Sequence, residues 1–194
     1  APPGVPASTP VSPARIDFSK AHLHTRAMSN KLPPKPRIVG PKLHVSIVAS
    51  KYNENFTNAL VENAVEELEK QIPHARIDIV RVPGAFEIPV VVANLLRHQP
   101  PACVIALGLI IRGSTDHADL IGQSVTQSLQ QLAVESLCPV IHEVLLVADE
   151  TQARARCMGD QLNRGREAAR TAARMIEVVQ ELARNSGRNP QGIH

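Results

Sequence analysis

The chain has 194 residues, which suits one domain with a tail, and no apolar run approaches the roughly 18–20 residues of a membrane span. Aromatic residues make up only 2% of the chain, which argues against an aromatic platform for single-stranded nucleic acid. The net charge of +3 is uneven, because residues 1–42 hold seven Lys and Arg residues and a single acid. The basic character therefore belongs mainly to the N-terminal segment.

Residues 1–37 are predicted to form a disordered, proline-rich, basic tail. Nine of the 16 prolines fall within residues 1–41, and such a segment cannot bury enough apolar surface to offset the entropy of ordering it. It lacks the apolar core of a secretory signal. We favour a solvated leader, with an organelle transit segment as the alternative. A folded domain is expected over residues 38–186, and a frayed end over residues 187–194.

Strands and helices alternate along the domain. Continuous apolar runs predict strands at residues 43–50, 76–82, 102–111 and 140–147. Apolar residues at helical spacing predict helices that begin at Asn53 or Asn55 and end at Gln71, cover 86–97, run from Asp116 or His117 to Ser136, and cover 150–158 and 166–184. This alternation predicts parallel strands with right-handed crossovers. The expected fold class is α/β, a flavodoxin-like three-layer α/β/α sandwich with a four-stranded parallel sheet.

A polar turn and a histidine follow the third predicted strand. The strand stops at Arg112 and Gly113, and Ser114, Thr115 and Asp116 lead to His117, where the next helix should begin. Ligands bind beyond the carboxyl ends of strands in open α/β sheets, and the free N–H groups that open a helix favour an anion. Because histidine exchanges protons near neutral pH, we predict an anion site with a proton-transfer group beside it.

Polar residues also follow the first two strands. Tyr52 and Asn53 come after the first strand, and a Pro-Gly turn brings Ala85 and Glu87 to the end of the second. By itself, the second segment reads as an ordinary strand-to-helix connection with Glu87 favoured by the helix dipole. Beyond the fourth strand, most of the arginines of residues 154–166 suit an exposed basic helix, but one guanidinium could bind a phosphate bidentately.

The cysteines and the remaining histidines indicate no metal site. Cys103, Cys138 and Cys157 are far apart, with neither zinc-type spacing nor a disulfide pattern, and we interpret them as small apolar residues in a reducing compartment. The other histidines pair with no acidic cluster. We therefore expect no metal and no cofactor.

Three motifs together resemble the lumazine synthase family. They are Pro-Gly-Ala-Phe-Glu-Ile-Pro at 83–89, Ile-Arg-Gly-Ser-Thr-Asp-His at 111–117, and Gln-Ala-x-x-Arg at 152–156 with Asn-Arg-Gly-x-Glu at 163–167. The similarity spans residues 38–184 in order and with matching spacing. It implies the penultimate step of riboflavin biosynthesis, in which 5-amino-6-(ribitylamino)uracil and 3,4-dihydroxy-2-butanone 4-phosphate give 6,7-dimethyl-8-ribityllumazine, phosphate and water.

The resemblance implies a role for each matching residue. His117 would transfer protons, and Glu167 would orient Arg156. The groups expected to bind phosphate are Gly113, Ser114, Thr115 and Arg156. The groups expected to hold the pyrimidine and its ribityl chain are Tyr52, Asn53, Ala85, Phe86, Glu87, Leu109, Ile110, Ile111 and His142.

Three positions depart from the family pattern. Ala118 replaces the usual aromatic residue after the histidine, and the loop after Arg156 lacks the frequent Gly and Lys residues. His142 stands where a neighbouring subunit commonly lends a Phe, which leaves the detail of pyrimidine stacking open.

The family assembles into pentamers with active sites between subunits, and some members close into sixty-subunit icosahedral shells. The resemblance leaves pentamer and shell open here. It implies a cytoplasmic homo-oligomer with two small-molecule substrates, riboflavin synthase as a candidate partner, and no nucleic-acid or membrane partner. The alternatives are a flavin- or lumazine-binding relative without catalysis, such as a carrier or shell protein, and a flavodoxin-like electron-transfer or signalling domain.

Overall fold

The computed structural model describes residues 43–186, so the predicted tail over 1–37 and the predicted frayed end over 187–194 lie outside the described residues. The four strands are β1 (His44–Ser50), β2 (Arg76–Val82), β3 (Cys103–Ile111) and β4 (Val140–Val147). They form one parallel sheet in the order β2-β1-β3-β4. Strand β2 lies on one side of β1, and β3 and β4 lie on the other, which is the doubly wound, flavodoxin-like arrangement. The predicted fold class is confirmed.

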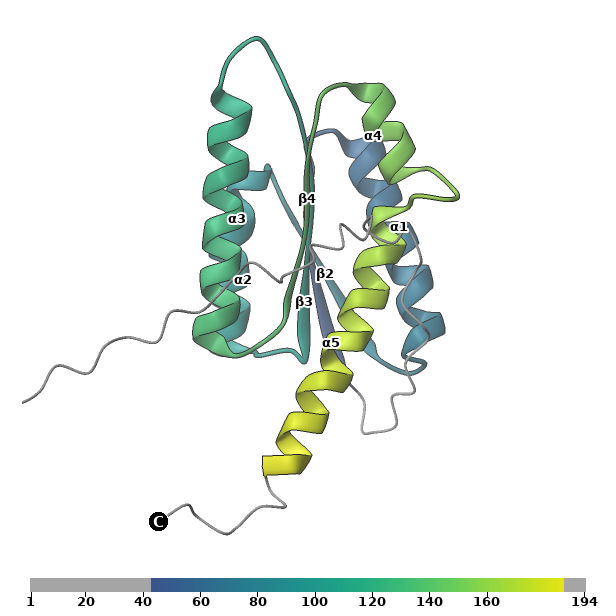
Figure 1. The fold of residues 1–194 in the computed structure, drawn as a ribbon, viewed down its shortest axis with the longest axis vertical. Coiled ribbons are helices and arrows are strands. Elements are labelled where there is room, and N and C mark those ends of the chain that lie inside the picture. The colour runs from purple at the N-terminus through teal and green to yellow at the C-terminus, as the bar shows by residue number, and fades with distance from the viewer. Residues whose placement is uncertain (1–42, 187–194) are drawn as a thin grey trace, which may run out of the picture. The chain divides into compact units, whose positions relative to one another are not determined.

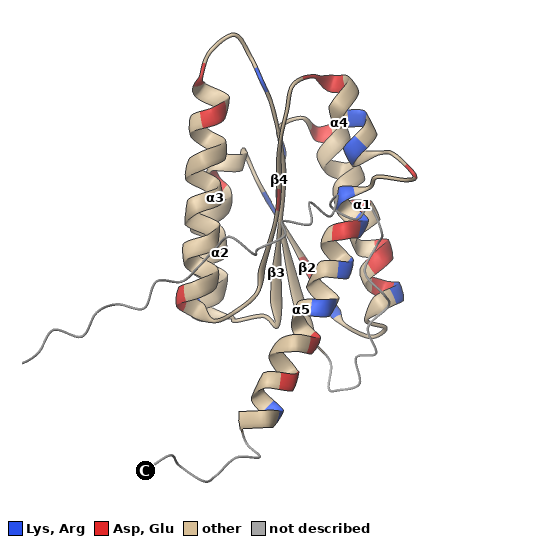
Figure 2. Cartoon of the chain, viewed as in Figure 1, with Lys and Arg blue, Asp and Glu red and all other residues tan. Residues whose placement is uncertain are grey.

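Helices cover both faces of this sheet. The helices are α1 (Glu54–Gln71), α2 (Ile88–His98), α3 (His117–Ser136), α4 (Glu150–Cys157) and α5 (Arg164–Ser186), with a single 3-10 turn, η2 (Ala85–Glu87), before α2. Figure 1 shows α2 and α3 on one face and α1, α4 and α5 on the other. The charged residues of the helices gather mainly on α1, α4 and α5, whereas α2 and α3 carry few (Figure 2). Within residues 43–186, no helix is both long enough and apolar enough to span a bilayer.

The core consists of two aliphatic clusters, one on each side of the sheet. Alternate residues of β1 divide between them, since Val45 and Ile47 pack towards α1 and α5, while Val48 packs towards α2 and α3. Every side chain from Cys103 to Leu109 is buried, as expected for a strand covered on both faces. The central strands are therefore rigid, and their carboxyl ends form a fixed edge.

Most predicted bounds lie within one or two residues of the observed ones, and the helix starts show the differences with a clear physical cause. The helix predicted over 86–97 is preceded by the 3-10 turn η2, and α2 proper begins at Ile88, with Pro89 in its first turn. Asn53 occupies the N-cap position of α1, as one of the two predicted alternatives, but its side chain makes no capping bond because the amide bonds elsewhere. Helix α5 starts at Arg164 rather than Arg166, because the side chain of Asn163 accepts a hydrogen bond from the backbone N–H of Arg166 at 3.1 Å.

Candidate active site

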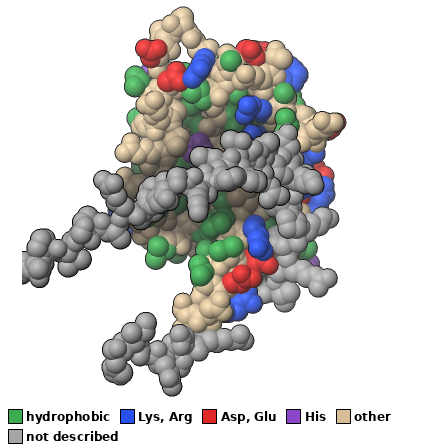
Figure 3. All heavy atoms as spheres, in the orientation of Figure 1, with side chains coloured by type: hydrophobic (Ala, Val, Ile, Leu, Met, Phe, Trp, Pro, Cys, Tyr) green, Lys and Arg blue, Asp and Glu red, His purple; other side chains and the backbone are tan. Residues whose placement is uncertain are grey.

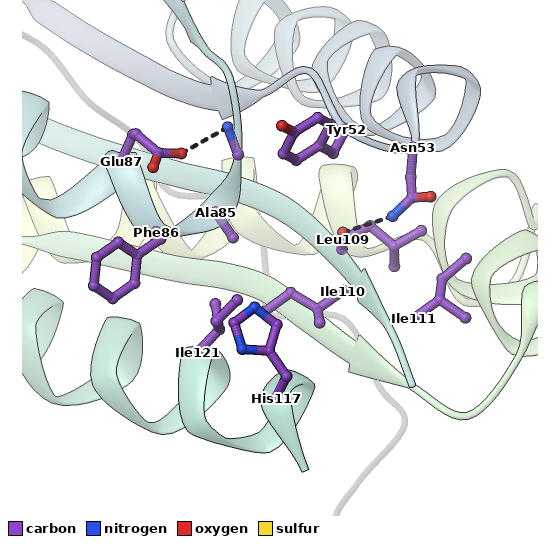
Figure 4. A pocket seen from close by; sticks show the side chains of 11 residues that line it. Tyr52, Asn53, Ala85, Phe86, Glu87, Leu109, Ile110, Ile111, His117 and Ile121 are labelled. Atoms are coloured by element: carbon purple, nitrogen blue, oxygen red, sulfur yellow. Dashed lines mark hydrogen bonds between the residues drawn. The ribbon is translucent and has the colours of Figure 1, made fainter. Parts of the chain in front are cut away.

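A cavity of about 650 Å³ opens beyond the carboxyl ends of β1, β2 and β3. It is lined by residues from the loops after these strands, from the end of β3 and from the start of α3: Tyr52, Asn53, Gly84, Ala85, Phe86, Glu87, Leu109, Ile110, Ile111, His117 and Ile121. Figure 4 shows these side chains surrounding one space. An apolar lining with a few convergent polar groups is typical of a small-molecule site.

The β1–α1 loop is held by Asn53. Its φ of 58° lies in the left-handed region, where asparagine is among the few non-glycine residues that are well tolerated. The side-chain amide donates a hydrogen bond of 2.9 Å to the carbonyl oxygen of Leu109 on β3 (Figure 4). The neighbouring Tyr52 lines the cavity and is 68% exposed as a residue. This loop therefore places one free aromatic ring and one fixed amide at the site.

The β2–α2 loop depends on a close approach at Gly84. The carboxylate of Glu87 accepts a hydrogen bond of 2.9 Å from the backbone N–H of Gly84 (Figure 4). A Cβ at position 84 would lie 2.9 Å from both Oε2 of Glu87 and Cδ2 of Tyr52. Only glycine fits without moving the aromatic ring or the carboxylate, so three cavity residues are positioned together.

The floor and the far wall of the cavity come from β3 and α3. Leu109 is buried, while Ile110 and Ile111 are partly open to the cavity. His117 is the first residue of α3, and its exposed ring lies over Ile110 and beside Ile121 in Figure 4. The structure thus brings an imidazole to the rim of an apolar floor.

The predicted phosphate turn lies next to this histidine. Gly113, Ser114 and Thr115 are exposed and connect β3 to the N-terminus of α3, but they do not line the cavity itself. The helix start is where N–H groups without intrahelical acceptors face outwards. The turn is therefore available to an anion beside the cavity, and its phosphate role stays a prediction.

Three predicted site residues lie away from the cavity of their own chain: His142, Arg156 and Glu167. The imidazole of His142 faces α3, with Nε2 2.9 Å from Oγ1 of Thr126, and burial lowers its pKa. Arg156 lies in the last turn of α4 and is partly buried. Glu167 accepts a hydrogen bond of 2.6 Å from Arg164, so its predicted action on Arg156 stays a prediction.

The sequence prediction missed two cavity residues and one partly buried acid. Gly84 belongs to the Pro-Gly turn that was noted without a role, and Ile121 lies one helical turn after His117, a spacing that places both on one face. Glu143 lies on β4, where burial raises its pKa to about 7. The nearby charge of Glu167 also raises this pKa, whereas that of Arg164 lowers it. A carboxyl group that changes its charge near neutral pH therefore lies close to Arg164 and Glu167 at the start of α5.

The sheet order and the cavity beyond its strand ends define a flavodoxin-like α/β protein with a small-molecule site. The family described as 6,7-dimethyl-8-ribityllumazine synthase matches residues 42–180. A 6,7-dimethyl-8-ribityllumazine synthase of Paracidovorax citrulli is 36% identical over 153 residues, which are 76% of this chain and 94% of that protein. The enzyme of the same name from Porphyromonas gingivalis is 38% identical, covering 70% and 85%. That from Thermococcus kodakarensis is 34% identical, covering 74% and 90%. The chain belongs to the 6,7-dimethyl-8-ribityllumazine synthase family, an enzyme family of riboflavin biosynthesis.

Proposed function

We propose that this protein condenses 5-amino-6-(ribitylamino)uracil with 3,4-dihydroxy-2-butanone 4-phosphate to give 6,7-dimethyl-8-ribityllumazine, phosphate and water. The observation that carries the proposal is the convergence of Tyr52, Glu87 and His117 on one apolar cavity next to an exposed helix-opening turn. Membership of the family supports this reaction, and the cavity with its neighbouring turn would hold both substrates.

The pyrimidine and its ribityl chain would occupy the cavity. The ring of Tyr52 is free to stack on a planar heterocycle, and the ends of β3 offer backbone groups at Ile110 and Ile111. Ala85, Phe86 and Glu87 would hold the ribityl chain, because a carboxylate accepts hydrogen bonds from hydroxyl groups. Asn53 would contact the pyrimidine from the side opposite its bond to Leu109.

The ketone phosphate would bind at the turn beside His117. Its phosphate would accept hydrogen bonds from the turn of Gly113, Ser114 and Thr115, and the ketone would then lie near the imidazole. The amine attacks the ketone to form an imine and releases water. Phosphate then leaves by elimination, and the enol tautomerises and closes the second ring with loss of a second water. His117 would carry protons between these steps, which supplies about 10²–10⁴ in rate, while holding two substrates together supplies the remainder.

We further propose a homo-oligomer, either a free pentamer or a sixty-subunit shell, with active sites between neighbouring subunits. Arg156, His142 and Glu167 lie outside the cavity of their own chain, so they would reach the cavity of a neighbour. Large apolar side chains are exposed on α3 and α5, including Leu120, Val134 and Leu182. Figure 3, which views the β4 edge, shows hydrophobic side chains at the surface between the two helical layers. Burial of such a surface in an interface is favourable.

The experiment is a two-substrate assay that follows the fluorescence of the lumazine product, run beside a mass measurement of the native particle. Lumazine formation with release of inorganic phosphate is expected. A protein that binds lumazine or flavin but forms no product would be the non-catalytic relative, and the proposal would then fail. The mass separates a pentamer from a sixty-subunit shell. Cell fractionation and co-purification with riboflavin synthase test the proposed cytoplasmic location and partner.

A further inference from the structure

An ion pair closes the turn between β3 and α3. Nη2 of Arg112 lies 2.6 Å from Oδ1 of Asp119. Arg112 is the first residue after β3, and Asp119 lies in the first turn of α3, two residues beyond His117. The pair therefore spans the turn of residues 113–116 and joins its two ends.

Both partners of this pair are attached to rigid parts of the fold. The backbone N–H of Arg112 donates a hydrogen bond of 2.9 Å to the carbonyl oxygen of Val147, the last residue of β4. Asp119 is fixed by the helix, and its neighbour Ala118 is buried against the core. A carboxylate in the first helical turn is also favoured by the helix dipole. The ion pair consequently ties the N-terminus of α3 to the carboxyl edge of the sheet.

Little else restrains the turn. Gly113, Ser114 and Thr115 are exposed, and the N-cap residue Asp116 makes no side-chain capping bond. Among the side-chain hydrogen bonds of residues 43–186, that between Arg112 and Asp119 is the one that connects the two ends of this turn. Its side chains are 54% and 40% exposed, so the pair adds little to global stability. Its effect is local.

We propose that Arg112 and Asp119 form a clasp that holds the turn of residues 113–116 and the imidazole of His117 in register with each other. The inference rests on the proposed function, in which that turn receives the phosphate of the ketone substrate. Because the guanidinium of Arg112 is engaged by Asp119, both are positioning residues. They shape the anion site and leave the contact with phosphate to the N–H groups of the turn and to the Arg156 proposed to reach it from a neighbouring subunit. Removing either partner leaves the turn free to sample other arrangements, and misplacement of a positioned group by a small distance is costly.

The test is a double-mutant cycle on the full chain with both substrates. Arg112→Ala and Asp119→Ala are each expected to raise KM for the ketone phosphate about tenfold, with little change in KM for the pyrimidine, and the double variant should be no worse than either single variant. The conservative variants Arg112→Lys and Asp119→Glu, which keep both charges in place, should each lose much less than the alanine variants. Arg76→Ala breaks an ion pair of 2.8 Å at the opposite end of the sheet and is the control that leaves both KM values unchanged.

Other outcomes would overturn the clasp. If Arg112→Ala weakens the phosphate substrate while Asp119→Ala does not, Arg112 contacts phosphate directly. If the melting temperature falls or both KM values rise equally, the pair is only structural. If the wild-type protein forms no lumazine, the proposed function fails instead. Titration of inorganic phosphate into the same variants then tests the clasp without turnover. Equal phosphate affinity in all of them would refute it.

Discussion

The side-chain amide of Asn53 donates a hydrogen bond of 2.9 Å to the carbonyl oxygen of Leu109, and this bond ties the loop after β1 to the end of β3. The same residue adopts a left-handed conformation, and its carbonyl oxygen accepts hydrogen bonds from the N–H groups of Phe56 and Thr57. One residue thus starts α1, turns the chain and fixes the wall of the cavity. Its loss should affect folding and binding together.

Replacing Asn53 separates these contributions. Asn53→Gly tolerates the left-handed conformation but removes the amide. Asn53→Ala removes the amide and also makes that conformation unfavourable. We expect Asn53→Ala to lower the free energy of unfolding by about 1–3 kcal/mol, from the lost bond and the backbone strain, and Asn53→Gly to lose less. Both should raise KM for the pyrimidine. Denaturant unfolding and steady-state kinetics measure this, and Asn55→Ala, at an exposed position two residues away, is the control.

The close approach at Gly84 predicts a second effect. In Gly84→Ala the new Cβ would meet Tyr52 and Glu87 at 2.9 Å, so the ring and the carboxylate must move. We expect KM for the pyrimidine to rise at least tenfold, the order expected when positioned groups are displaced. Gly122→Ala, in α3, has no atom nearer than 3.7 Å to its new Cβ and should instead stabilise the helix slightly. Unchanged pyrimidine binding in Gly84→Ala would contradict the role of this contact.

The elements could be predicted from the sequence because local signals agree with the fold. Val140–Val147 was located to the residue, since an apolar run lies between turn-forming segments. The predicted start of α2 was wrong, because the chain first forms the 3-10 turn η2. In that turn the Glu87 carboxylate accepts a hydrogen bond from the N–H of Gly84. That contact is not visible as periodicity.

The side-chain partners of the candidate site were harder to predict. Asn53 looks like an ordinary helix cap until Leu109, 56 residues later, is brought beside it. Glu167 has its bond to Arg164 three residues away, a helical pairing that competes with any bond to Arg156. Such choices depend on distances across the folded chain, and a motif does not contain them.

His117→Ala tests the proposed proton transfer. We expect kcat to fall by tens-fold or more, because a positioned general acid–base contributes about 10²–10⁴ in rate. KM for either substrate should change little, since the phosphate would bind through the turn. Stopped-flow or steady-state fluorescence of the product measures the effect. His98→Ala, at the exposed end of α2, is the matched control. A His117→Ala enzyme with unchanged kcat would remove the histidine from the chemistry.

Arg156→Ala tests the proposed phosphate contact from α4. We expect KM for the ketone phosphate to rise about 10–100-fold with the pyrimidine unaffected, because a hydrogen bond to a charged group is worth about 1.5–3 kcal/mol. Arg154 is a matched control on the same helix, since its guanidinium lies over the ring of Phe56, 5.9 Å from its centroid. Arg154→Ala should keep both KM values. A fully active Arg156→Ala variant would overturn the phosphate assignment.

Glu143 predicts how stability depends on pH. Burial raises its pKa to about 7 in the folded protein, whereas the same carboxyl in the unfolded chain titrates near 4.5. The folded state therefore keeps a proton that the unfolded chain has already released. The stability contributed by the neutral form is fully present below pH 4.5 and is lost as pH rises through 7.

In Glu143→Gln this loss should disappear, and the free energy of unfolding at pH 8 should rise by about 1–3 kcal/mol, since one pKa unit corresponds to about 1.4 kcal/mol. Denaturant unfolding between pH 5 and 8 measures the slope. Glu69→Gln, at an exposed position of α1, removes a carboxylate without burial and should leave the wild-type slope unchanged. If Glu143→Gln keeps the wild-type slope, another group titrates in this range and the raised pKa of Glu143 is not its cause.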